Sequence, residues 1–324
     1  MKKRRIGKSN LEVYPIGLGA MGMSEFYGAS DDEKSVALIH KAIEMGVNFI
    51  DTADMYGVGH NEMLLSRALK GKFKDIVLAT KFGILRTPDG GRAGVSGRPE
   101  YVKQACEASL KRLGTDVIDL YYLHRVDPQT PIEDTVGAMA ELVNEGKVRY
   151  IGLSEVNGNT LKRAYAVHPI TAVQSEYSLW TRDNEEANLN ECRRLGVSTV
   201  AYSPLGRGIL TGKLKEITDP KDFRANYPRL NKENLENNLK VVEKIEQIAG
   251  AKGVQASQIA LAWLLHRGDD IIPIPGTRHE NYLRENIESV NIELSKDEIS
   301  QLNTLSALVK GTRYDENGMK LTLQ

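Results

Sequence analysis

Short apolar runs alternate with amphipathic helical patterns along almost the whole chain, and this alternation limits the possible folds most strongly. The eight β-rich runs cover residues 16–18, 49–50, 76–80, 117–122, 150–153, 172–174, 198–202 and 271–274. Strands that alternate with helices pair in parallel, and they are apolar on both sides because helices cover the sheet. Eight such units predict a protein of the α/β class, with a (β/α)8 or TIM barrel.

Helix start signals support this alternation. Ser30 with Glu33 has the spacing of a capping box, and so has Thr130 with Glu133. Each pair precedes a run whose apolar residues recur at helical spacing. We therefore expect one helix to begin near residue 31 and another near residue 131.

Four segments fall outside the eightfold pattern. Residues 4–14 resemble a β-hairpin that could cross the bottom of the barrel, and Ser295 with Glu298 predicts an extra C-terminal helix. The stretches 82–97 and 205–231 read as long irregular loops after strands. Loops of that length are usually functional, so both are expected to border the active face.

Composition narrows the class of protein. Lys plus Arg and Asp plus Glu both number 43, so the overall charge does not indicate a nucleic-acid or membrane partner. A hydrophobic content of 41% argues against disorder. Cys106 and Cys192 lack metal-ligand spacing and are expected to be reduced thiols. The basic start Met1–Arg5 lacks the apolar stretch of a secretory signal. We expect one cytoplasmic domain over residues 1–324, with homo-oligomers left open.

Four polar residues follow or end consecutive predicted strands. Asp51 follows the second strand and Tyr56 lies in the loop after it, Lys81 closes the third, and His124 closes the fourth. Strand ends share one face of a parallel barrel, where catalytic groups lie. A lysine at the end of a buried strand is costly unless it is paired, and Asp51 is the natural partner. Taken singly, each residue could instead be a cap or a packed side chain.

With these four residues the chain resembles the aldo-keto reductases over almost its full length, from Ile6 to the last helix. The family's Asp, Tyr, Lys and His tetrad maps onto GVNFIDTADMYG, ATKFG and LYYLHRVDP. The resemblance implies a barrel that uses NADPH (as the NADPH/NADP couple) to reduce aldehydes or ketones to alcohols without a metal. Its substrate would be a small carbonyl compound.

Further motifs match the family's cofactor cleft, namely IGLSE, QSEYSLW, AYSPLGRG, ILTGK and IPGTR. By this resemblance, Ser154 and Gln174 would bind the nicotinamide carboxamide, and Tyr202 would stack on the ring. The remaining cofactor residues implied are Ala20, Met21, Ser203, Pro204, Leu205, Gly206, Arg207, Lys213, Gly276, Thr277, Arg278, Tyr282, Glu285 and Asn286. Among these, the resemblance places Arg278 beside the 2′-phosphate and Lys213 beside a phosphate.

The tetrad also suits carbonyl reduction on physical grounds. Hydride delivery to the carbonyl carbon leaves negative charge on oxygen, so a proton donor and positive groups are needed there. Tyr56 could donate the proton, and the nearby Lys81 ammonium would lower the pKa of its phenol from about 10. Asp51 would hold Lys81 charged. A neutral His124 would donate a hydrogen bond that orients the substrate oxygen.

Two departures from the family pattern bear on the site. Glu155 stands after Ser154 where many members have Asn, and Tyr282 stands where others carry Arg or Gln. The tail after the last helix is short and polar. Substrate choice is therefore expected to depend on loops near Met21, 82–97, Trp180 and 207–231.

Two other interpretations compete with a barrel reductase. Gly17, Gly19 and Gly22 match the G-x-G-x-x-G fingerprint of a doubly wound dinucleotide fold, with Asp51 ending the next strand. That motif needs a helix beginning at the glycines, but residues 23–29 are loop-like. The second alternative is a non-catalytic or slow NADPH-binding regulatory subunit with the same fold, which the tetrad does not exclude.

Overall fold

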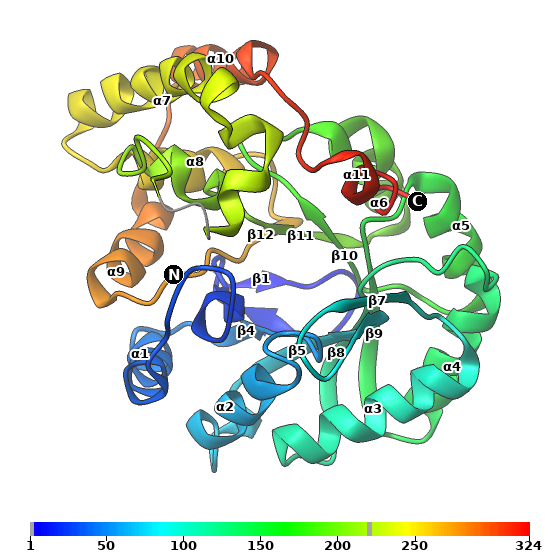
Figure 1. The fold of residues 1–324 in the computed structure, drawn as a ribbon. Coiled ribbons are helices and arrows are strands. Elements are labelled where there is room, and N and C mark those ends of the chain that lie inside the picture. The colour runs from blue at the N-terminus through cyan, green and yellow to red at the C-terminus, as the bar shows by residue number, and fades with distance from the viewer. Residues whose placement is uncertain (1–2, 219–221) are drawn as a thin grey trace.

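The computed structural model describes residues 3–218 and 222–324, and it confirms the predicted barrel. Eight parallel strands form one sheet in the order β12-β11-β10-β9-β8-β5-β4-β3, and Figure 1 shows helices surrounding them. The strands are β3 Leu18–Gly19, β4 Phe49–Asp51, β5 Val77–Phe82, β8 Ile118–Leu123, β9 Val148–Ser154, β10 Ala172–Glu176, β11 Ser198–Tyr202 and β12 Ile271–Pro273. Each contains or adjoins one of the predicted runs.

Hydrogen bonds next to β3 and β12 join the two ends of the sheet. The Gly17 amide donates to Pro273 O at 2.9 Å, and the Gly19 amide donates to Pro275 O at 3.2 Å. Both glycines are needed for this close approach. A Cβ on Gly17 would lie 2.7 Å from Phe49 Cδ1, and one on Gly19 would lie 2.9 Å from a backbone oxygen.

The same segment rules out the doubly wound alternative. After the glycine motif the chain forms only the short 3-10 helix Met21–Met23, and the first α-helix, α1, begins at Asp32. A dinucleotide fingerprint requires an α-helix opening at the glycines. These glycines therefore serve barrel closure.

The helices follow the strands as predicted. They are α1 Asp32–Glu44, α2 His60–Ala68, α3 Pro99–Leu113, α4 Ile132–Asn144, α5 Gly158–Val167, α6 Asn190–Leu195, α7 Lys232–Lys252, α8 Ala256–Leu265, α9 Glu280–Glu288, α10 Lys296–Asn303 and α11 Glu316–Met319. Helix α10 is the predicted extra C-terminal helix, and its capping box of Ser295 and Glu298 is present. None of the helices in the described ranges is long and apolar enough to cross a membrane.

Two of the predicted capping boxes are wrong. Helix α1 is capped by Asp31, which accepts from the Lys34 amide, because the helix begins one residue later than Ser30 requires. Helix α4 has Pro131 at its N-cap and no side-chain cap. The Thr130 hydroxyl instead donates to Asp127 at 2.9 Å, so it is already engaged in the preceding loop.

Within residues 3–218 and 222–324, two antiparallel hairpins lie outside the barrel. Strands β1 Arg4–Arg5 and β2 Glu12–Val13 pair as the predicted N-terminal hairpin. The segment 82–97, expected to be irregular, contains a second hairpin formed by β6 Ile84–Arg86 and β7 Arg92–Val95. Strand β7 is mostly exposed and β6 has only two apolar residues, both half-buried, so neither shows the long buried apolar run of the central barrel strands.

The long segment between β11 and α7 contains short 3-10 helices. They are η4 Gly206–Thr211, η5 Phe223–Asn226 and η6 Pro228–Leu230. Residues 219–221, part of the loop predicted over 205–231, lie outside the described residues. The described parts of this segment lie near the carboxyl ends of the strands and supply part of the pocket described below.

The core has one apolar layer inside the barrel and another between strands and helices. Inside the barrel, Phe49, Leu120 and Tyr122 from the strands pack with Ile6 and Val13 from the hairpin. The hairpin therefore closes the amino-terminal end of the barrel with apolar side chains. The two cysteines are buried free thiols, as expected.

Candidate active site

The fold brings Asp51, Tyr56, Lys81 and His124 together at the carboxyl ends of β4, β5 and β8. Lys81 Nζ donates to Asp51 Oδ1 at 2.5 Å and to the backbone oxygen of Thr52 at 2.7 Å. It also lies 3.3 Å from the Tyr56 hydroxyl. The Tyr56 and His124 rings meet edge to face, with centroids 6.0 Å apart.

Lys81 is fully buried behind Tyr56 and keeps its charge. Burial alone lowers the pKa of its ammonium, but Asp51 and Tyr56 outweigh that effect and raise it. For Asp51, burial raises the pKa, while Lys81 and the Gln174 amide oppose the change by hydrogen bonding to its carboxylate. Both carboxylate oxygens are engaged, because Gln174 Nε2 donates to Oδ2 at 2.8 Å.

The acidity of Tyr56 differs from the sequence-based expectation. Burial raises its pKa above the usual value of a phenol, and the Lys81 ammonium opposes this increase without reversing it. The effect of Lys81 has the expected sign, but desolvation of the phenolate is larger. Tyr56 is therefore protonated at neutral pH, which suits a proton donor.

His124 is neutral at neutral pH. Burial is the largest cause of its strongly lowered pKa, and the positive charges of Arg125, Lys81 and Arg92 lower it further. Its Nδ1 is buried and has no hydrogen-bond partner among the residues described. Because a buried unpaired N–H is costly, this favours the tautomer with the proton on Nε2.

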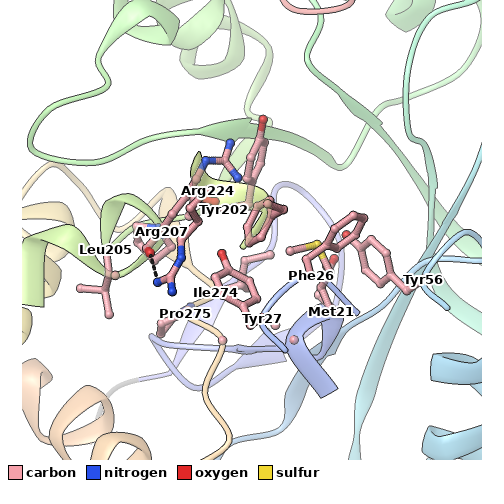
Figure 2. Close-up of a pocket in the computed structure, with 18 of the residues that line it drawn as sticks. Met21, Phe26, Tyr27, Tyr56, Tyr202, Leu205, Arg207, Arg224, Ile274 and Pro275 are labelled. Carbon is pink, nitrogen blue, oxygen red and sulfur yellow. Dashed lines mark hydrogen bonds between the residues drawn. The ribbon is translucent and has the colours of Figure 1, made fainter. Parts of the chain in front are cut away.

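A single pocket of about 780 Å³ opens over the tetrad. Asp51, Tyr56 and His124 line it, whereas Lys81 lies behind its wall. Figure 2 shows Met21 and Phe26 beside Tyr56, with Tyr27 and Tyr202 farther along and Leu205 at the opposite end of the drawn group. The pocket thus extends well beyond the space that a small carbonyl compound would need.

Most of the residues implied as cofactor contacts line this same pocket. They are Met21, Ser154, Gln174, Tyr202, Ser203, Pro204, Leu205, Arg207, Lys213, Gly276, Thr277, Arg278, Tyr282, Glu285 and Asn286. Ala20 and Gly206 are buried next to it but do not line it. A Cβ on Gly206 would lie 2.7 Å from the Trp180 ring, so that glycine serves packing.

The pocket suits an elongated dinucleotide. Polar side chains of Ser154 and Gln174 lie near the tetrad, and the basic residues Lys213 and Arg278 line the same pocket. Gly19 and Gly276 also line it and lie next to each other, since a Cβ on Gly276 would be 3.0 Å from Gly19 O. Glycine backbone in the lining together with polar and basic side chains suits a nicotinamide nucleotide.

Both basic residues implied as phosphate contacts already have partners. The Arg278 guanidinium donates to backbone oxygens of residues 27–29, including that of Ala29 at 2.5 Å. Lys213 Nζ lies 4.1 Å from the centroid of the Tyr282 ring and 3.4 Å from the Glu285 carboxylate. Arg278 thus braces the loop between β3 and α1 in this conformation.

That loop packs against η5. The Phe223 ring lies 5.4 Å from the Phe26 ring and 4.9 Å from the Tyr27 ring, and the Arg224 guanidinium lies over Tyr27. All four side chains line the pocket, so these two segments form one of its walls. Trp180, expected near the substrate, is buried behind the wall and does not line the pocket.

The C-terminal tail also lines the pocket, which sequence reasoning missed. Tyr314, Asp315, Asn317, Gly318 and Leu321 all face it. The Tyr314 hydroxyl lies 2.9 Å from the hydroxyl of Tyr202. The tail therefore belongs with the expected loops among the segments that border the pocket.

A buried ion pair fastens this tail. Arg313 Nη1 and Nη2 bond Glu155 Oε1 and Oε2 at 3.1 and 3.2 Å, and both side chains are almost completely buried. The Tyr202 hydroxyl and the Glu176 amide also donate to Glu155. Burial alone would raise the pKa of Glu155, but Arg313 and Arg125 outweigh it and lower the pKa. Glu155, unusual after Ser154, thus serves as the anchor of the tail.

A family model and solved structures match this chain over most of its length. The model of the Aldo/keto reductase family matches residues 15–307. A thermostable aldo-keto reductase solved with the inhibitor epalrestat is 33% identical, with 94% of this chain and 100% of that chain covered and a TM-score of 0.77. Glycerol dehydrogenase AKR11B4 from Gluconobacter oxydans is 29% identical, with 97% and 98% covered and a TM-score of 0.87. The holo form of aldo-keto reductase AKR11C1 from Bacillus halodurans is 30% identical, with 98% and 99% covered and a TM-score of 0.77.

Proposed function

Because the chain belongs to the aldo/keto reductase family, whose members reduce carbonyl groups with a nicotinamide cofactor, we propose that it reduces aldehydes or ketones with NADPH and that Tyr56 donates the proton. The observation that carries this proposal is the buried Lys81 ammonium, held between Asp51 and the Tyr56 hydroxyl at the wall of one long pocket. A buried lysine paired in this way on a pocket wall is typical of a functional site.

The tetrad would act on the carbonyl oxygen. A nicotinamide cofactor held in the pocket would supply the hydride for the carbonyl carbon, so these residues must handle the negative charge that develops on the oxygen. Tyr56 gives its hydroxyl proton to that oxygen, which yields the alcohol. The resulting phenolate is stabilised by the Lys81 ammonium 3.3 Å away. A positioned acid of this kind contributes about 10² to 10⁴-fold to the rate.

The other two tetrad members would position and tune these groups. His124 Nε2, protonated in the neutral tautomer, would donate a hydrogen bond to the carbonyl oxygen. Asp51 keeps Lys81 charged and directed toward Tyr56 through the 2.5 Å bond to its carboxylate. The second carboxylate oxygen of Asp51 accepts a hydrogen bond from Gln174. This bond would orient the side-chain amide of Gln174 toward a bound nicotinamide.

We also propose that NADPH is preferred to NADH. Arg278 can offer planar, two-point recognition of a phosphate, and Lys213 adds a second positive charge to the same pocket. The Arg278 contacts to residues 27–29 are to neutral carbonyl oxygens. A phosphate dianion is a stronger acceptor than a carbonyl and could share or replace these contacts.

A Tyr56→Phe variant tests the proton donor. It should lose at least about 100-fold in turnover of a neutral aromatic aldehyde, followed by the absorbance of reduced cofactor, and should bind NADPH as wild type does. Tyr150→Phe is the matched control, because the Tyr150 hydroxyl bonds Asn10 at the other end of the barrel. Turnover retained in Tyr56→Phe would mean that the proton comes from another group.

A further inference from the structure

Arg125 is a pocket-lining residue that directly follows His124. Its Nη1 donates to the backbone oxygen of His124 at 2.7 Å and to Ser154 Oγ at 3.2 Å. Within the described part of the chain, these are the hydrogen bonds of its side chain, and no carboxylate forms a salt bridge with it. The remaining N–H groups, on Nη2 and Nε, are left for another partner.

Two other arginines in the pocket wall, Arg207 and Arg224, are paired with carboxylates. Arg207 Nη2 donates to Glu176 at 3.0 Å, and both side chains are buried. Arg224 holds the Asp222 carboxylate with a shortest distance of 2.6 Å. Arg92 also lines the pocket, but it lies exposed to water on β7. Arg278 lines the pocket too and bonds only backbone oxygens, but the proposed function assigns it to the cofactor phosphate. Among the described pocket arginines, Arg125 is thus the partly buried one with neither a carboxylate partner nor an assigned ligand.

Glu155, the carboxylate whose charge acts on Arg125, is already paired with another arginine. The charge of Glu155 acts on Arg125, but both Glu155 oxygens are bonded to Arg313. Removing a cation from water without pairing it is costly, and an anion from a ligand would offset that cost. The pocket thus holds positive charge that the protein itself does not neutralise by direct contact.

This charge lies at the reaction centre. Arg125 bonds the backbone of His124 and the side chain of Ser154, and its charge acts on the Tyr56 phenol. An anionic group bound there would be carried by the same molecule whose carbonyl oxygen meets Tyr56 and His124. It would therefore be a second point of attachment for the substrate.

We propose that Arg125 binds a carboxylate of the carbonyl substrate, so that the preferred substrates are oxo or formyl acids. The inference rests on the proposed reductase function and specifies its substrate class. The planar fork of Nη2 and Nε matches the two oxygens of a carboxylate. The nicotinamide carboxamide, which Ser154 is expected to meet, is neutral and would not offset the charge.

The test compares acids with their neutral esters. The ortho, meta and para isomers of formylbenzoate and their methyl esters place the carboxylate at three separations from the aldehyde. The acid-to-ester ratio of kcat/KM is measured with saturating NADPH for wild type, Arg125→Gln and Arg125→Lys. Arg149→Gln is the control for net charge, because Arg149 is 60% exposed and pairs with Asp119 outside the pocket.

The expected result is a clear preference for at least one acid in the wild-type protein. Arg125→Gln should lower that ratio about 10- to 100-fold while still reducing the ester, since a hydrogen bond to a charged group is lost. Arg125→Lys should keep part of the preference, and Arg149→Gln should keep all of it. The dissociation constant of NADPH should be unchanged in Arg125→Gln.

Several results would overturn the inference. An unchanged ratio in Arg125→Gln would assign Arg125 to bracing the backbone, and an unchanged ratio with weaker NADPH binding would assign it to the cofactor. If Arg125→Gln does not fold, the wild-type protein still provides a test. A higher kcat/KM for the ester than for the acid with all three isomers would refute the carboxylate site. If the wild-type protein reduces the esters but none of the acids, only the carboxylate site is refuted. If it oxidises NADPH with none of the six compounds, the reductase function is refuted as well.

Discussion

Breaking the ion pair between Arg313 and Glu155 is expected to destabilise the protein strongly. The Arg313→Met variant keeps an unbranched apolar stem but leaves the Glu155 carboxylate with hydrogen bonds from only the Tyr202 hydroxyl and the Glu176 amide. Both members of the pair are at most 1% exposed. Removing one partner of such a pair typically costs about 3–5 kcal/mol, because a buried charge loses its counter-charge.

Urea denaturation at neutral pH measures this loss. Arg284→Met is the matched control, since Arg284 and Glu280 are 51% and 56% exposed and their pair should contribute about 0.5 kcal/mol or less. Adding Glu155→Gln to Arg313→Met should recover part of the loss, because the carboxylate that lost its partner is then removed. A loss below about 1 kcal/mol in Arg313→Met would refute the argument that this pair fastens the tail.

The pH dependence of the loss provides a second check. The folded protein holds the pKa of Glu155 below its usual value, which is about 4.3 in an unfolded chain. The stability that follows from this lowered pKa is therefore fully present above about pH 4.3 and is lost as pH falls through the folded pKa. The difference between wild type and Arg313→Met should accordingly be largest near neutral pH and shrink in acid.

Four further outcomes follow from the site. Arg278→Ala should weaken NADPH binding about 10- to 100-fold in a fluorescence titration and leave NADH binding nearly unchanged, and an unaltered ratio of the two constants would exclude Arg278 as the phosphate ligand. Lys81→Met should lower kcat at least about 100-fold, because the phenolate of Tyr56 loses its cation, and should also destabilise the fold by leaving Asp51 buried and unpaired. The pH profile of kcat/KM should show no inflection near pH 6.5 from His124, whose folded pKa is strongly lowered; such an inflection, absent from His124→Gln, would contradict the neutral tautomer. Below about pH 6.5, His124 binds a proton in the unfolded protein but stays neutral in the folded protein. Its contribution should therefore lower the free energy of unfolding as pH falls below about 6.5.

The fold could be predicted from the sequence because its elements are local and repeated. Each barrel strand is buried on both sides and therefore appears as an apolar run, and glycines such as Gly114 end helices in the left-handed conformation. The exact helix starts were less predictable. Asp31 caps α1 in place of its neighbour Ser30. Thr130 does not cap α4, because its hydroxyl bonds Asp127 in the preceding loop.

The tetrad could be located from the sequence because strand ends meet by topology. Asp51, Lys81 and His124 needed only a correct assignment of β4, β5 and β8 to be placed side by side. The acidity of Tyr56 could not be derived in the same way. Its sign depends on how completely water is excluded from the phenol, and in this structure burial outweighs the Lys81 ammonium.

The C-terminal tail marks where sequence reasoning stopped. The tail is short and polar, and Arg313 lies 158 residues from Glu155 in the sequence, with no pattern that links the two residues. The pair exists because Glu155, at the end of β9, takes a left-handed backbone conformation with φ of 54° and its carboxylate enters the interior. A non-glycine residue in that conformation carries strain, which the four hydrogen bonds to its side chain offset.

The Glu155 carboxylate also holds Tyr202 and, through Arg313, brings Tyr314 to the pocket wall. A change at Glu155 should therefore alter the expected nicotinamide platform and the substrate wall together, although Glu155 itself lines neither.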